Sequence, residues 1–110
     1  MSEEQIEKSK LAVEAAEHIS PEQKAKLLGA LSKIKPVIGQ ASQVHAEHAQ
    51  NVAKLIEASA HTAAHDNQRP DRLKHILQEL KQSAQNFEAS HPQLTAAVTE
   101  YSTVLSALGI

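Results

Sequence analysis

The sequence has no cysteine and almost no aromatic residues: it has one tyrosine, one phenylalanine and no tryptophan in 110 residues. The lack of cysteine excludes disulfide scaffolds, thiolate zinc sites and thiol catalysis. The scarcity of aromatic rings argues against a surface that stacks on nucleic-acid bases. The 13 acidic and 11 basic residues give a net charge of −2, which is not the basic balance of a nucleic-acid-binding protein. We therefore expect no nucleic-acid partner.

Long apolar runs are also missing. No run approaches the roughly 20 residues that a membrane-spanning helix needs, and the acidic start of the chain lacks the pattern of a signal peptide. We therefore expect a cytoplasmic protein with no membrane partner. The sequence has neither a glycine-rich phosphate loop nor a nucleophile elbow, so we expect no enzymatic activity, no catalytic residue and no cofactor.

Glycine and proline are few, and most of the prolines stand where helices begin. Ser20 and Ser90 are each followed closely by proline, with glutamine three residues after the serine, which is typical of helix N-caps. Pro36 instead interrupts an apolar pattern and predicts a kink or a break, which Gly39 strengthens. The sequence therefore predicts five helices, at about residues 3–17, 21–35, 37–65, 71–89 and 92–108.

Apolar residues recur at helical spacing, most clearly in the last two predicted helices. Their two stripes are related by a constant shift of 21 residues: Leu73, Ile76, Leu77, Leu80, Ala84 and Phe87, then Leu94, Ala97, Val98, Tyr101, Leu105 and Leu108. The short link between them predicts an αα-hairpin. No segment alternates as a strand does. The expected fold class is all-α, an antiparallel bundle of four to five helices in one domain, residues 1–110.

The first and third predicted helices are poor in large apolar side chains. In the first, Ile6 and Val13 share a face while Leu11 lies on the other side, so we expect it to pack late, to fray or to dock on a partner. The third has a stripe of mixed size, and its many alanines, among them Ala49, Ala53, Ala60 and Ala63, allow close approach by another helix. The stripe is Ala41, Val44, Val52, Leu55, Ile56, Ser59 and Ala63. These features and the low net charge favour a non-enzymatic interaction protein that self-associates as a homodimer, with an unidentified second protein as an alternative partner.

Histidine is abundant, with seven residues, and four of them form two pairs in the third predicted helix. His45 with His48, and His61 with His65, have the spacing that places two imidazoles on one side of a helix and that suits a metal ion. The first pair falls in the apolar stripe. It is interpreted as hydrogen-bonded core-edge or interface residues, as a pH-sensitive interface, or as two ligands of a metal site. The second pair falls on the polar face, as a solvated helix end. The alternative function is a histidine-mediated metal- or ligand-binding bundle.

The C-terminal part of the chain resembles a known family. Residues 87–94, FEASHPQL, and residues 105–110, LSALGI, are similar to the F-E-x-S-H-P-x-L segment and terminal G-I of small bacterial proteins grouped as domain of unknown function 4404. The resemblance covers about residues 71–110, and the alanine- and histidine-rich third helix departs from that family's pattern. It implies a helical bacterial domain and supplies no activity, cofactor or site residue.

Overall fold

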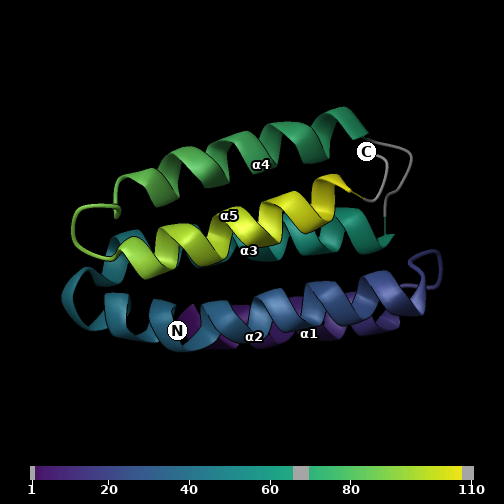
Figure 1. Ribbon diagram of the computed structural model, residues 1–110, viewed down its shortest axis with the longest axis horizontal. Coiled ribbons are helices and arrows are strands. Elements are labelled where there is room, and N and C mark those ends of the chain that lie inside the picture. Colours follow the sequence, from purple (N-terminus) through teal and green to yellow (C-terminus); the bar gives the residue numbers. More distant parts are fainter. Residues whose placement is uncertain (1, 66–69, 108–110) are drawn as a thin grey trace.

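The computed structural model describes residues 2–65 and 70–107, and this part of the chain forms five helices. They are α1 (Ser2–Ala15), α2 (Pro21–Val44), α3 (Ala46–His65), α4 (Pro70–Gln85) and α5 (Pro92–Ser106). The helices run along the long axis of the molecule (Figure 1). The 24 residues of α2 span about 36 Å, close to the 37 Å length of the whole. The predicted all-α bundle is confirmed. None of the described helices is long and apolar enough to cross a membrane.

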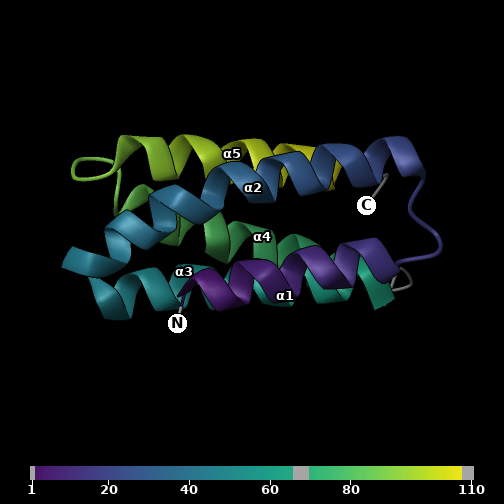
Figure 2. The same cartoon turned by 90° about the horizontal axis from the view of Figure 1, so that it is seen from below.

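Four of the helices close into a ring. In order, α2, α3, α4 and α5 each contact the next, and α5 contacts α2 again. Consecutive helices run in opposite directions (Figures 1 and 2), as in an up-and-down four-helix bundle. α1 lies outside this ring and contacts α2 and α3 (Figure 2). The predicted C-terminal hairpin forms one half of the ring, as α4 and α5.

The core of the ring is built from the predicted stripes of α4 and α5 and from the buried side of α2. Fully buried large side chains include Leu27, Leu31, Ile34, Ile38, Leu73, Leu80, Phe87, Leu94 and Leu105. Leu108, the last predicted position of the final helix, lies outside the described residues. Tyr101 is also fully buried; its hydroxyl lies 2.7 Å from the Ser59 hydroxyl and donates to the Ile56 carbonyl at 3.3 Å. Burial raises the pKa of Tyr101, so the hydroxyl stays protonated and joins α5 to α3.

Of the kink or break predicted at Pro36, the break is wrong. α2 continues through Pro36 to Val44, and the chain leaves helical geometry at His45, with φ −128° and ψ 63°. The second half of α2 bends toward α3 (Figure 2). Proline removes one backbone hydrogen bond, but Ile38 and Ala41 beyond it are fully buried and hold the following turns in the helix. The predicted helix 37–65 is therefore divided between the end of α2 and α3.

α1 packs within the chain, which answers the alternatives left open for the first predicted helix. Ile6 and Val13 are buried and Leu11 is 64% exposed, as their positions predicted. α1 runs parallel to α3: Ser2 Oγ donates to Gln50 Oε1 at 3.3 Å near one end, and His18 Nε2 lies 2.6 Å from the Ala63 carbonyl oxygen near the other.

A series of buried residues in and just after α1 and a series in α3 share one spacing, alternately four and three residues, and the two helices contact each other. The first series is Ser2, Ile6, Ser9, Val13 and Ala16, and the second is Ala49, Ala53, Ile56, Ala60 and Ala63. We call this contact the α1–α3 seam. The spacing is that of a coiled coil, and the small side chains let the two backbones approach closely. The small residues predicted to invite another helix are therefore covered by a helix of the same chain.

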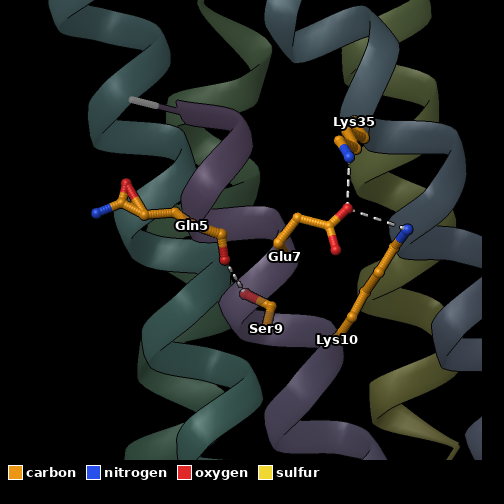
Figure 3. A network of polar contacts seen from close by, with 5 residues as sticks. All are labelled: Gln5, Glu7, Ser9, Lys10 and Lys35. Carbon is orange, nitrogen blue, oxygen red and sulfur yellow. Dashed lines mark hydrogen bonds and ion pairs between the residues drawn. The ribbon is translucent and has the colours of Figure 1, made fainter.

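An exposed network also fixes α1 to α2 (Figure 3). Glu7 Oε1 accepts a hydrogen bond from Lys35 Nζ at 2.5 Å and lies 3.7 Å from Lys10 Nζ. The bond to Lys35, and then the charge of Lys10, lower the pKa of Glu7, and the same bond raises the pKa of Lys35. The contribution of Glu7 to stability is thus lost as pH falls through its lowered pKa, and that of Lys35 as pH rises through its raised one. Exposed pairs contribute little, so the seam is the main attachment of α1.

The two serines predicted as N-caps give a matched test. Ser20 Oγ accepts a hydrogen bond from the Gln23 N–H at 3.2 Å, as predicted. The prediction for Ser90 is wrong, because the N-cap of α5 is His91 and its side chain makes no capping bond. We expect Ser20→Ala to lower the free energy of unfolding by about 1 kcal/mol and Ser90→Ala to leave it nearly unchanged. Urea denaturation measures both, and equal losses would contradict the assignment.

A second test concerns the continuity of α2. Since the helix runs through Pro36, Pro36→Ala restores a backbone donor within a helix. We expect the free energy of unfolding to rise by about 1–3 kcal/mol, measured by thermal and urea unfolding. If the chain broke at Pro36, the same substitution would be neutral or destabilising.

Candidate functional site: a histidine cluster

Three histidine side chains surround the single phenylalanine at one end of the four-helix bundle. The ring centroid of Phe87 lies 4.2 Å from that of His48, 5.8 Å from that of His45 and 5.6 Å from that of His91. The centroids of His45 and His91 are 5.7 Å apart. We call these four residues the histidine cluster. It joins the corner between α2 and α3 to the loop between α4 and α5.

His45 and His48 reach the cluster from the corner between α2 and α3. The His45 N–H donates to the Ala41 carbonyl at 2.8 Å, and its own carbonyl accepts from the Ala49 N–H at 2.9 Å, so this residue ends α2 and precedes the first turn of α3. The His45 side chain is exposed, whereas His48 is half-buried and stacks on Phe87 with the two planes 28° apart. The neighbouring Val44, predicted in an apolar stripe, is 69% exposed because the corner ends that stripe.

Phe87 and His91 are placed by a tight turn after α4. The Phe87 carbonyl accepts hydrogen bonds from the Ser90 N–H at 3.0 Å and from the His91 N–H at 2.6 Å. This turn brings the half-buried His91 ring against Phe87 and His45, edge to face. His91 Nε2 is buried and has no hydrogen-bond partner. Such an atom is rare in a folded protein, because burial without a partner costs free energy.

Open hollows lie on either side of the cluster. One of about 250 Å³ is bordered by His91, by Pro92 and Gln93 at the start of α5, and by Gln40 of α2. A wider one, about 670 Å³, follows α3 and α4 and is bordered at its end by His48. The hollows therefore border His91 and His48 from two sides, while His91 Nε2 itself is buried.

The second predicted pair does not join this cluster. His61 is 13 residues beyond His48, about 20 Å along α3, and its exposed Nε2 lies 3.9 Å from Glu57 Oε1, on the predicted polar face. The side chain of His65 lies outside the described residues. Among the side chains that the structure describes, no group of three or more His, Asp or Glu could hold a metal ion.

The sequence pattern missed His91. His91 is far from His45 along the chain, so no local pattern shows their contact. The break predicted at Pro36 also placed His45 within a helix, whereas it lies at the corner between α2 and α3. The one available signal was that FEASHP follows a helix whose stripe ends at Phe87. In an antiparallel hairpin, such a loop lies at the end of the bundle, beside other corners.

Comparison with known proteins gives no relationship: no family model matches the chain, and neither the curated proteins nor the solved structures contain a match. The resemblance of residues 71–110 to domain of unknown function 4404 stays a prediction.

The cluster predicts a specific response to loss of the aromatic ring. We expect Phe87→Leu to shift the side-chain proton resonances of His45, His48 and His91 together, because all three rings lie within 6 Å of Phe87. His75, which pairs with Glu79 at 2.9 Å on the exposed face of α4, is the internal control. Histidine-selective NMR measures these shifts, and a change confined to His48 would contradict the cluster.

Proposed function

We propose that this chain is a non-enzymatic interaction protein that self-associates by exchanging α1 between two copies. The observation that carries the proposal is the place of α1: it lies outside a ring of four helices that closes without it. When α1 leaves, the α2–α5 ring keeps all of its own helix contacts and exposes the faces of α3 and α2 on which α1 lay. A second copy of α1 has the chemistry and the spacing to cover those faces.

The α1–α3 seam favours exchange over a new interface. Its buried residues are mostly alanine and serine, and the large apolar side chains that α1 buries are Ile6 and Val13. An exchanged α1 re-forms the same seam on the partner, so the two states differ little in contact energy. The dimer is then favoured by protein concentration, as in other domain-swapped proteins.

The connection between α1 and α2 acts as the hinge in this proposal. His18 is exposed and holds the connection to the end of α3 through the Ala63 carbonyl. Ile19, next to it, is 4% exposed and is anchored in the core. Exchange requires the chain to extend at Glu17 and His18 while Ile19 stays in place. Loss of the His18 contact therefore makes opening easier.

This mechanism replaces the dimer expected from the sequence alone. That expectation needed unpartnered apolar faces on the first and third predicted helices, and these faces cover each other within one chain. Exchange uses the same faces without requiring either to be unpartnered. A helix of another protein with the same spacing would compete for the same surface of α3.

Cross-linking between single-cysteine variants tests the exchange. The chain has no cysteine, and the Gln5 and Gln50 side chains meet across the two helices, with Gln50 Nε2 donating to Gln5 Oε1 at 2.8 Å. Gln5→Cys and Gln50→Cys are made separately, mixed and treated with a short bismaleimide. We expect a covalent heterodimer whose yield rises with protein concentration, and several-fold more of it when both chains carry His18→Ala.

Three controls make the result decisive. Each single variant alone gives the background, the double variant shows that both sites react within one chain, and His75→Ala is the matched histidine control on an exposed helix face. Efficient cross-linking in the double variant without a heterodimer in the mixture would overturn the exchange. A monomer by light scattering at high concentration would overturn self-association altogether.

A further inference from the structure

We infer that the contact of Glu7 with Lys35 selects the partner when α1 is exchanged between two copies of the chain. The inference rests on the exchange proposed above and states which second copy of α1 the α2–α5 ring accepts. Lys35 belongs to α2, which stays in the ring, and Glu7 belongs to α1, which leaves it. Their contact therefore breaks when α1 leaves, and it forms again with the α1 that takes its place.

The other contacts of α1 do not depend on its charge. The side chains of the α1–α3 seam are small or apolar, and none of them is charged. Near the hinge, Lys24 Nζ of α2 donates to the Glu14 carbonyl at 3.0 Å, a backbone acceptor that any α1 offers. Farther from the hinge, Lys35 Nζ donates to a side chain, the carboxylate of Glu7 (Figure 3). The choice between an acidic and a basic α1 is therefore made at Lys35.

A second carboxylate of α1 meets the same part of α2. The hydrogen bond to Glu7, and then the charges of Glu7 and Glu3, raise the pKa of Lys35. Glu3 also lies close to Gly39, one turn beyond Lys35, because a Cβ on residue 39 would be 2.9 Å from Glu3 Oε1. Two acidic side chains one turn apart on α1 thus face one lysine and one position without a side chain on α2. This part of α2 suits an acidic helix.

The contact acts on the choice of partner and does not drive self-association. Exchange between identical chains breaks one ion pair and forms the same one again. Between chains of different charge, a basic residue at position 7 would face Lys35 and be repelled. Lys10 lies 3.7 Å from Glu7, but it is part of α1 and moves with it. One exposed pair contributes little, whereas an exchanged dimer contains two such contacts.

Charge reversal on separate chains tests the selection. Glu7→Lys places a lysine against Lys35, and Lys35→Glu places a glutamate against Glu7, so each variant alone has a repulsive contact. Exchange between the two variants replaces both repulsive contacts with attractive ones. The first variant also carries Gln5→Cys and the second Gln50→Cys. We expect about tenfold more bismaleimide-linked heterodimer than from the two cysteine variants with native charges, and this gain to disappear in about 1 M salt.

The double reversal gives the opposite expectation. Glu7→Lys with Lys35→Glu in one chain restores the attraction within that chain. Mixed with a chain of native charge, it meets repulsion in both exchanged contacts, and we expect the heterodimer yield to fall about tenfold below that of the native mixture.

The matched control is the exposed ion pair of Lys33 and Glu100, whose charged atoms are 2.9 Å apart. This pair joins α2 to α5 within the ring, so exchange of α1 does not break it. Lys33→Glu on one chain and Glu100→Lys on the other change the net charges of the two chains by the same amounts as the test variants. We expect this mixture to give the native heterodimer yield.

Circular dichroism establishes that each variant is folded, and the double reversal still tests the selection where a single reversal unfolds the chain. Equal yields from all mixtures, with exchange present in the native one, would overturn the selection and leave the exchange standing. An equal rise with the Lys33 and Glu100 reversals would also overturn it, because net charge alone would then explain the gain. No heterodimer in any mixture would overturn the exchange itself.

Discussion

The close packing of α1 on α3 is the contact on which the place of α1 in the molecule depends. α3 packs on two sides at once: one side meets α1 along the seam, and the other contributes Ser59 and the Ile56 carbonyl to the buried contact with Tyr101. Alanine at most seam positions makes this double packing possible, because larger side chains would hold the two parallel backbones apart. α3 has too few large side chains to form a core alone, and it is stabilised by packing against α1, α2 and α4.

Histidines make contacts at both ends of α3. Near its end, His18 holds the connection between α1 and α2 through the Ala63 carbonyl. At its start, His45 forms the corner that faces His91. The proposed exchange of α1 opens the first of these contacts and leaves the second intact.

Elements whose stripe is formed by large residues were predictable, and elements that depend on small residues were not. The stripes that end at Phe87 and begin at Leu94 predict the hairpin of α4 and α5. Large apolar side chains such as leucine and phenylalanine mark clearly which face of a helix is buried. Pro36 predicted a break since it removes a backbone donor, yet the buried Ile38 outweighs that loss. The corner at His45 carries no strong local signal, so its position depends on how α2 and α3 meet the ring.

The sequence by itself determined the class of the fold, the number of helices, the faces of the last two helices and the cap at Ser20. These follow from local periodicity and hydrogen bonding, which act over one or two turns. The tertiary structure alone decided that α1 covers α3, that the chain turns at His45, and that His91 joins the cluster around Phe87. Each of these joins residues far apart in the chain, and such contacts are chosen by packing of the whole bundle, which no local pattern records.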